Sequence, residues 1–352
     1  MTTGKKFLAA TSMLATMVAS TPAWASGTPA GSTITNNVTV DYKVGGVSQT
    51  QLSASNSFTV DRKVNLTVAE SGSSTTTVSP GQQGAVTTFV VTNTSNAIAD
   101  FALAAANRPD SSTAAHGGTD NFDVTGIKIY ADTNTNGTFE SGTDLEISYL
   151  DQIAADVSRT VFVVANIPLG RTNLDVAGVR LTATAHEATA AGSLGAAVTQ
   201  STGANTAGVD TVFADTDAGG NTAGDGIHFA EDDYTIGAAS LSVTKTSRIV
   251  SDPVNDTTNP KMIPGAVVEY CVIVANAADS ATATNVSISD SLPGTTTYLS
   301  SFGILLNGTY SSGTCAADGD PGGSHSSGTI TATLSDIAAG VTRTVLFRVT
   351  VN

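Results

Sequence analysis

Short segments in which apolar and polar residues alternate recur along the chain, and glycine, proline, asparagine and serine separate them. A period of two places successive side chains on opposite faces of a strand, and many short strands joined by turns are typical of an all-β sandwich. Threonine and valine, which favour strands, are abundant in these segments. The pattern predicts strands near 62–69, 85–92, 98–105, 124–131, 145–150, 158–166 and 177–185, and again near 240–246, 266–275, 284–290, 302–307, 328–334 and 342–351.

The chain contains an internal repeat. LDQIAADVSRTVFVV, from Leu150, matches LSDIAAGVTRTVLFR, from Leu334, and GAVTTFVV, from Gly84, matches GAVVEYCV, from Gly265. Two matched blocks at nearly the same offset predict two copies of one unit. The strand near 177–185 has no counterpart in the second copy, and residues 186–236 are interpreted as an elaborated acidic loop or hairpin.

The N-terminus has the features of a secretory signal peptide. Lys5 and Lys6 precede an apolar run at 7–20, and Ala23-Trp24-Ala25 is a small-residue cleavage site. The run is shorter than the roughly 20 residues of a membrane-spanning helix. We therefore expect a secreted or cell-surface protein without membrane insertion, divided into a signal peptide at 1–25, an N-terminal strand or hairpin at 26–60, a first sandwich at 61–236 and a second at 237–352.

The net charge of −15 disfavours nucleic acid and anionic lipid as partners, whereas it favours divalent cations. The four histidines are far apart and show no zinc-ligand spacing. The chain also lacks a nucleophile elbow of the Gly-x-Ser-x-Gly type. We expect a protein that is not an enzyme.

A set of residues within 240–352 has a recognisable pattern: Pro264, Gly265, Tyr270, Asn276, Asn285, Val286, Asp290, Leu292 and Pro293. Through these residues the second copy resembles the bacterial surface-repeat family known as domain of unknown function eleven. The first copy keeps Pro80, Gly81, Phe89 and Asn93 but lacks the Asp-x-Leu-Pro element. The resemblance implies two tandem immunoglobulin-like sandwiches and an extracellular structural role.

The segment TITNNVTVDY, at 33–42, is similar to the closing strand of this family's repeats, yet it precedes the first copy. Its apolar residues Ile34, Val38, Val40 and Tyr42 alternate with polar ones, and Gly45-Gly46 predicts a turn after it. We expect this strand either to complete the second copy of another subunit, or to fold with the rest of 33–60 onto its own first copy. The first possibility predicts a head-to-tail homo-oligomer that grows into a fibre or layer. The alternative function is a monomeric adhesin or carbohydrate-binding module.

The stretch YADTNTNGTFESGTD, which begins at Tyr130, has the oxygen-ligand spacing of a calcium loop, with Gly137 at its sharp turn. The candidate ligands are Asp132, Asn134, Asn136, the carbonyl of Thr138, Glu140 and Asp144. In an EF-hand loop the twelfth position carries an acid, whereas here the acid, Asp144, comes one residue later. No helices are predicted to flank the loop. The alternatives are therefore a weak structural Ca²⁺ site and a polar turn whose side chains bind their own backbone.

A second acidic loop follows Phe213 and offers Asp215, Asp217, Asn221 and Asp225 as weaker candidate ligands. Its spacing fits no known ion-binding loop, and the alternative is a solvated insert.

Cys271 and Cys315 are the two cysteines of the chain, and in an exported protein a pair of cysteines predicts a disulfide. Strand alternation places Val268, Tyr270, Val272 and Val274 toward the core and Cys271 on the opposite face. The bond would therefore hold the loop after the strand near 302–307 across the outside of the sheet.

Overall fold

A computed structural model describes residues 27–217 and 222–352. This part of the chain contains 27 strands and no helix, which confirms the predicted all-β fold class. It consequently contains no helix long and apolar enough to cross a membrane. The predicted signal peptide at 1–25 lies outside the described residues.

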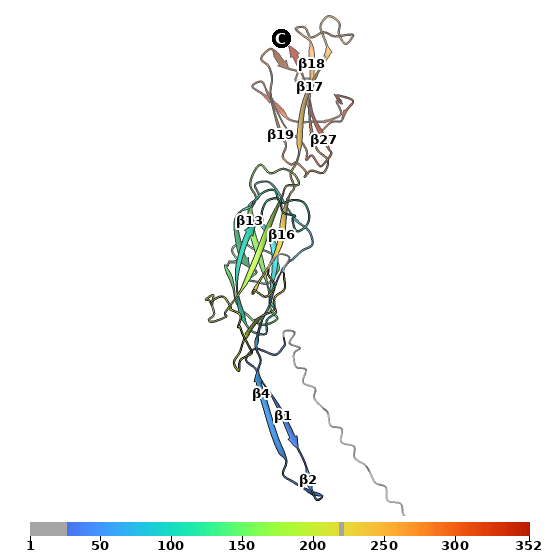
Figure 1. Cartoon of the computed structure of the whole chain (residues 1–352). Coiled ribbons are helices and arrows are strands. Elements are labelled where there is room, and N and C mark those ends of the chain that lie inside the picture. Colours follow the sequence, from blue (N-terminus) through green and yellow to red (C-terminus); the bar gives the residue numbers. More distant parts are fainter. Residues whose placement is uncertain (1–26, 218–221) are drawn as a thin grey trace, which may run out of the picture.

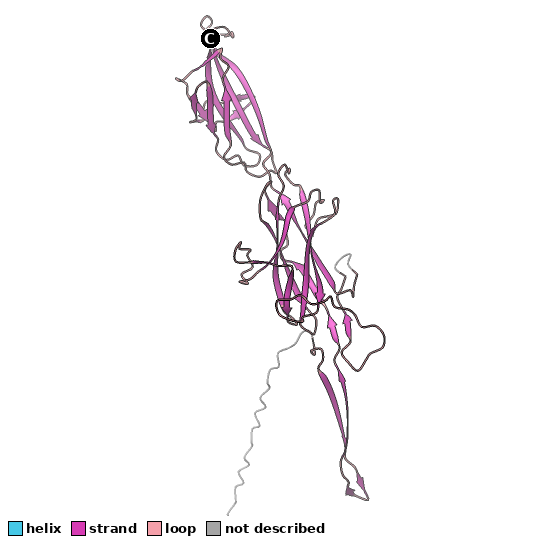
Figure 2. Ribbon diagram, turned by 90° about the vertical axis from the view of Figure 1, so that its left-hand side faces the viewer, coloured by secondary structure: helices cyan, strands magenta, loops and turns pink. Residues whose placement is uncertain are grey.

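The β-structure has three parts in a row (Figures 1 and 2). An N-terminal hairpin extends from one end of a central sandwich (residues 62–236), and a C-terminal sandwich (residues 241–351) follows at the other end. The hairpin and the C-terminal sandwich therefore lie at opposite ends of the molecule.

The hairpin consists of β1 (Thr33–Val40) and β4 (Leu52–Thr59), which pair along their whole length. Two short strands, β2 (Lys43–Val44) and β3 (Val47–Ser48), close its tip. Gly45 and Gly46 connect them with φ angles of 59° and 85°, the left-handed values that a tight hairpin turn requires. The turn predicted at these glycines is confirmed.

The central sandwich packs two five-stranded sheets face to face, ordered β11-β10-β13-β8-β6 and β12-β9-β14-β16-β7. The strands are β6 (Leu66–Glu70), β7 (Thr76–Val78), β8 (Ala85–Asn93), β9 (Ala99–Asn107), β10 (Thr125–Ala131), β11 (Leu145–Glu146), β12 (Tyr149–Ile153), β13 (Ser158–Asn166), β14 (Val176–His186) and β16 (Ile227–Ile236). A short parallel pair, β5 (Arg62–Val64) and β15 (Thr211–Phe213), lies outside both sheets. Inward residues of β8, namely Thr87, Phe89 and Val91, are buried as their alternation predicts.

Strand β16 is a correction to the sequence analysis, which interpreted residues 186–236 as a loop or hairpin leading into the second copy. It pairs with β14 over nine residues and belongs to the second central sheet. Its acidic run Glu231-Asp232-Asp233 conceals the alternation, because carboxylates are rare in sheet interiors. The structure compensates Glu231 with the cations Arg108, at 2.9 Å, and Arg180, at 2.5 Å.

The C-terminal sandwich has a large sheet of order β17-β18-β27-β21-β24, with β20 also paired to β27, and a small sheet of order β19-β26-β25. The strands are β17 (Leu241–Ser251), β18 (Val267–Asn276), β19 (Ser287–Ser291), β20 (Thr296–Tyr298), β21 (Ile304–Leu306), β24 (Asp320–Pro321), β25 (Ser324–Ser326), β26 (Thr329–Thr333) and β27 (Thr342–Val351). A short hairpin of β22 (Tyr310–Ser311) and β23 (Thr314–Cys315) lies outside these sheets.

The two sandwiches share fine detail, as the repeat predicts. The Asn93 side chain donates to the carbonyls of Ala97 and Ile153 at 2.9 and 2.7 Å. The Asn276 side chain donates to those of Ala281 and Ile337 at 2.8 and 2.9 Å. Because these bonds tie corresponding turns, strands can be matched between the sandwiches: β6 with β17, β8 with β18, β9 with β19, and β13 with β27.

Candidate functional site

The hairpin has one apolar face, and that face is open to solvent. Paired residues share a face of a two-stranded sheet, and this face carries the pairs Ile34–Phe58, Val38–Ala54 and Val40–Leu52, interrupted by the polar pair Asn36–Asn56. The five large apolar side chains of this face, Ile34, Val38, Val40, Leu52 and Phe58, are all exposed. Tyr42 lies just beyond β1 and is exposed as well.

The hairpin does not lie on the central sandwich, in contrast to one of the two arrangements expected from the sequence. Its strands form a separate two-stranded sheet, and β1 is exposed along its whole length. Its root is attached through Asn96, whose side chain donates to the carbonyls of Thr28 and Asp61 at 3.1 and 2.9 Å. The hairpin therefore extends away from the central sandwich (Figure 1).

A strip of the C-terminal core lacks a cover. Leu66 and Leu241 hold the same register position, opposite Asn93 and Asn276, and Val68 and Val243 hold the next inward position. Leu66 and Val68 are 0% and 4% exposed, whereas Leu241 and Val243 are 42% and 65% exposed. In the central sandwich β14 and β16 continue the second sheet beyond β9. Among the described residues of the C-terminal sandwich, 241–352, neither strand has a counterpart, and the small sheet ends at β19.

Strand β19 is an edge whose outward backbone groups can accept another strand. The Leu292 N–H donates to Gly328 at 2.8 Å, and the Leu334 N–H donates to Val286 at 2.9 Å. Hydrogen-bonding direction alternates along an antiparallel strand, so the N–H groups of Ser287, Ser289 and Ser291 point away from β26. We call the strip formed by β19 and the inward face of β17 the open edge.

One ion pair crosses the open edge. Lys245 of β17 binds Asp290 of β19 at 2.6 Å, and its ammonium lies 4.6 Å from the centre of the Tyr270 ring. This pair covers part of the exposed core with charge rather than with apolar atoms.

The candidate calcium loop joins β10 to β11, and two of its predicted ligands are buried, namely Asp132 and Asp144. The Asp132 carboxylate accepts the N–H groups of Asn136 and Gly137 at 3.2 and 2.9 Å. The Asp144 carboxylate accepts those of Thr133 and Glu140 at 3.0 and 2.8 Å.

The remaining ligands of this loop are exposed. Asn134 donates to Glu140 at 2.5 Å, the Asn136 side chain accepts the Thr138 N–H at 2.8 Å, and Gly137 has a φ of 76°. These hydrogen bonds join side chains of the loop to other groups of the same loop. The loop therefore gathers its carboxylate and amide groups within one short segment.

The second acidic loop uses its first carboxylate to bind backbone. Asp215 is buried and accepts the N–H groups of Gly224, Asp225 and Gly226 at 3.1, 3.2 and 2.9 Å. Asp225 accepts the N–H of Ile227 at 2.9 Å. Asp217 lies beside the gap in the described residues, and Asn221 lies outside them.

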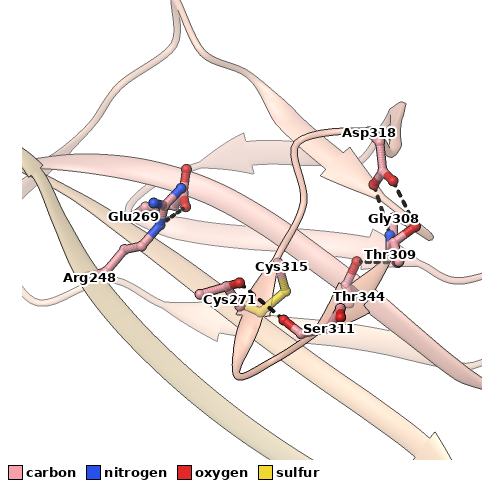
Figure 3. Close-up of a disulfide and its surroundings, with 10 residues drawn as sticks. Arg248, Glu269, Cys271, Gly308, Thr309, Ser311, Cys315, Asp318 and Thr344 are labelled. Atoms are coloured by element: carbon pink, nitrogen blue, oxygen red, sulfur yellow. Dashed lines mark hydrogen bonds and ion pairs between the residues drawn. A yellow bond between two sulfur atoms is a disulfide. The ribbon is translucent and has the colours of Figure 1, made fainter.

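Cys271 and Cys315 are joined in a disulfide, with their Cα atoms 6.0 Å apart (Figure 3). Cys271 packs with Ile273 and Leu346 on the outer face of the large sheet, while Val268, Val272 and Val274 lie in the main core, as alternation predicts. Glu269 of the same outer face is buried and binds Arg248 at 2.6 Å and Arg348 at 2.8 Å. The disulfide therefore fastens the loop around β23 over this face.

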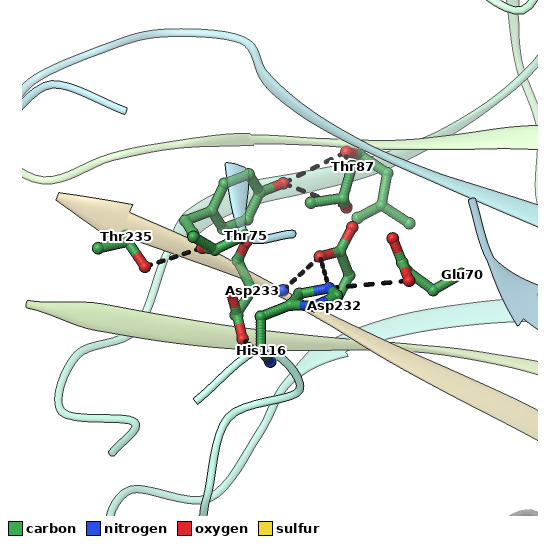
Figure 4. Close-up of polar contacts among 9 residues, drawn as sticks. Glu70, Thr75, Thr87, His116, Asp232, Asp233 and Thr235 are labelled. Atoms are coloured by element: carbon green, nitrogen blue, oxygen red, sulfur yellow. Dashed lines mark hydrogen bonds and ion pairs between the residues drawn. The ribbon is translucent and has the colours of Figure 1, made fainter. Parts of the chain in front are cut away.

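A further polar cluster lies in the seam between the two central sheets (Figure 4). Among the described residues, Glu70, His116 and Asp232 bring one ligand atom each to within 4.8 Å of the others. Burial raises the pKa of Asp232 to about 6; the carboxylate of Glu70 acts in the same direction, while the Asp233 N–H and His116 oppose it. Sequence spacing gives no sign of this cluster, because its members come from distant parts of the chain.

Asp120 is a buried carboxylate that gives the central sandwich a pH dependence. Burial raises the pKa of Asp120 from 3.8 to about 6; the carboxylates of Asp110 and Asp123 act in the same direction, while the Gly178 N–H and Arg108 oppose it. The folded state therefore favours protonated Asp120. The contribution of this proton to the free energy of unfolding is complete below pH 3.8 and is lost as the pH rises through 6.

We expect Asp120→Asn to flatten the dependence of unfolding free energy on pH across this window and to be more stable than the natural protein at neutral pH. Urea unfolding of both proteins over a pH series measures the difference. The exposed Asp336→Asn is the control and should follow the natural protein; an Asp120→Asn profile parallel to the natural one would contradict the assignment.

No family model matches the chain, so its resemblance to domain of unknown function eleven remains a prediction. No curated protein matches it either.

Among solved structures, the chain is similar to the C-terminal domain of the AgI/II polypeptide BspA of Streptococcus agalactiae, at 10% identity and a TM-score of 0.36, covering 81% of this chain and 91% of that one. It is similar to the CupB6 tip adhesin of Pseudomonas aeruginosa, at 9% identity and a TM-score of 0.27, with 81% and 88% covered. It is also similar to a putative membrane anchored protein of Corynebacterium diphtheriae, at 12% identity and a TM-score of 0.20, with 91% and 89% covered. Such low identities and TM-scores transfer no function to this chain.

Proposed function

We propose that the chain is an extracellular structural subunit that assembles head to tail, with the hairpin of one subunit covering the open edge of the next. The observation that carries this proposal is the difference in burial between matched positions: Val68 is 4% exposed and Val243 is 65% exposed. An inward-facing valine of a sandwich belongs in a core, so a covering element is expected there.

The hairpin matches what the open edge lacks. The C-terminal sandwich is short of two adjacent antiparallel strands, the counterparts of β14 and β16, and the hairpin supplies two antiparallel strands of eight residues each. One strand can pair with β19 through main-chain hydrogen bonds, while the apolar face covers Leu241 and Val243. The sequence predicts one donated strand, at 33–42; the pairing of β1 with β4 along their whole length supports the donation of both.

Energetics make this contact feasible. Full burial of a large apolar side chain contributes about 1.5–3 kcal/mol, and the hairpin exposes five of them on one face. Because these side chains are 38–60% exposed, about half of their full value, about 4–8 kcal/mol in all, is available, which is at the lower end of the roughly 4–15 kcal/mol that association costs in lost freedom. Hydrogen bonds along β19 and the newly covered part of β17 would add the remaining stabilisation.

The placement of donor and acceptor favours contact between subunits. They lie at opposite ends of the molecule, with the central sandwich between them (Figures 1 and 2). A contact between two different surfaces of identical subunits is heterologous, and it grows a filament unless the rotation closes a ring.

Electron microscopy and sedimentation of two chains test the proposal. The chain 27–352 should form filaments or rings, and the chain 61–352, without the hairpin, should remain single particles. Filaments from 61–352 would contradict it. Single particles from 27–352 at high concentration would also contradict it, and would favour the monomeric adhesin or carbohydrate-binding alternative.

We also propose that the loop between β10 and β11 binds Ca²⁺ as a structural ion. The convergence of the buried Asp132 and Asp144 on one short loop supports this, because Ca²⁺ prefers carboxylate and carbonyl oxygens.

Chelation should therefore lower the free energy of unfolding of the central sandwich. When free Ca²⁺ exceeds the dissociation constant about tenfold, the loss is about 1.4 kcal/mol. Calorimetry of the chelator-stripped protein without added metal and with millimolar Ca²⁺ measures it, and Asp132→Ala should abolish the difference while Asp336→Asn retains it. Equal melting temperatures of the natural protein in both buffers would exclude the site.

A further inference from the structure

The cluster of Glu70, His116 and Asp232 is assembled from three elements of the central sandwich. Glu70 ends β6 at the edge of one sheet, Asp232 lies in β16 of the other, and His116 comes from the segment between β9 and β10. Figure 4 shows the three side chains pointing toward one another across the seam.

Local structure holds His116 in place. A bridge between Thr113 and Thr119 and the hydrogen bond from the Ala114 N–H to Gly118, at 3.2 Å, form a tight turn with His116 near its tip. The His116 N–H donates to the buried Asp233 carboxylate at 2.7 Å. The Asp233 N–H in turn donates to Asp232 Oδ1 at 2.7 Å, which orients that carboxylate.

The distances from His116 to the two carboxylates suit ligands around a shared ion and are longer than those of a hydrogen-bonded pair. His116 Nε2 lies 3.4 Å from Asp232 Oδ1 and 3.7 Å from Glu70 Oε2. A charge-assisted hydrogen bond would be about 2.7–2.9 Å long. Two ligand atoms about 2.1 Å from a tetrahedral ion lie about 3.4 Å from each other. Nε2 is buried and, among the described residues, has no hydrogen-bond partner.

The second sandwich provides an internal comparison. Glu70 lies opposite Phe89, and Lys245 holds the same register position opposite Val272. There, Lys245 supplies a cation to Asp290 across the seam. In the central sandwich a glutamate replaces the lysine, so two carboxylates meet, and the nearby His116 is a cation only when it is protonated.

We propose that Glu70, His116 and Asp232 bind a divalent metal ion of the zinc class. One imidazole and two carboxylates suit Zn²⁺, and a water molecule would complete the tetrahedron. The ion fastens the segment carrying His116 to both β6 and β16, so its role is to close the seam between the two sheets.

Equilibrium dialysis of the chelator-stripped chain 27–352 against micromolar Zn²⁺, with metal analysis, tests the proposal. We expect one Zn²⁺ per chain and at least about tenfold weaker binding in His116→Gln and Asp232→Asn. His325→Gln removes a histidine far from the cluster in sequence and should bind as the natural protein does. Co²⁺ as a substitute should show tetrahedral visible absorption that His116→Gln removes.

Circular dichroism of each variant verifies that it is folded, so that loss of metal cannot reflect unfolding. Absence of bound Zn²⁺ in the natural chain would overturn the proposal, and so would binding that His116→Gln and Asp232→Asn, both folded, leave unchanged.

Discussion

A chain carrying Ser289→Pro is expected to fold as the natural protein does but to lose the ability to form filaments. The Ser289 N–H points away from β26, so proline removes no hydrogen bond within the subunit, and proline is tolerated in edge strands. A strand added at the open edge would lose that donor and would meet the proline ring. An unpaired buried carbonyl costs about 1–3 kcal/mol, so the concentration needed for assembly should rise about tenfold or more.

Ser289→Ala is the matched control, because it changes the same exposed side chain and keeps the N–H. Light scattering against protein concentration measures the assembly threshold of both variants, and circular dichroism verifies their folding. Filaments of Ser289→Pro at the natural threshold would show that β19 is not the acceptor.

Replacement of both cysteines by serine is expected to destabilise the C-terminal sandwich by about 4 kcal/mol. The disulfide closes a loop with a sequence separation of 44, and the chain-entropy model gives a value of that size. The packing of Cys271 and Cys315 against Ile273 and Leu346 would weaken as well. Hydrogen exchange in β18 and β27, followed by mass spectrometry, reports the loss in this sandwich separately from the central one.

Reductant should destabilise the C-terminal sandwich of the natural protein to the same extent. It should not change the stability of the serine variant. Two free thiols in natively exported protein, or equal exchange protection with and without the bond, would contradict this account.

Much of the fold follows from local pattern. Alternation at Thr87, Phe89 and Val91 and at Val268, Val272 and Val274 predicts the buried faces, because one side of each strand meets the opposite sheet. The same alternation places Cys271 outside the core, where the disulfide is found. The repeat identifies Ile153 and Ile337 as equivalent, and both accept the hydrogen bond of a buried asparagine.

The sequence pattern fails where tertiary pairing overrides local signals. β16 carries Glu231, Asp232 and Asp233 in the middle of a sheet, and the compensation of Glu231 by Arg108 and Arg180 depends on distant segments. The cluster with Glu70 is hidden for the same reason. Comparison of the two sequence copies shows that the second copy lacks an equivalent of β14. It does not show the same for β16, because β16 itself has the composition of a loop.

Photo-crosslinking from Phe58 tests the central proposal most directly. Phe58 is exposed on the apolar face of the hairpin, and benzoylphenylalanine replaces it with little change in shape. Isotope-labelled chains with this residue are mixed with unlabelled natural chains, assembled, irradiated and digested. The account predicts crosslinks from the labelled hairpin to β17 or β19 of unlabelled chains. Crosslinks that join labelled peptides of one chain only, or that reach unlabelled segments away from the open edge, would contradict it.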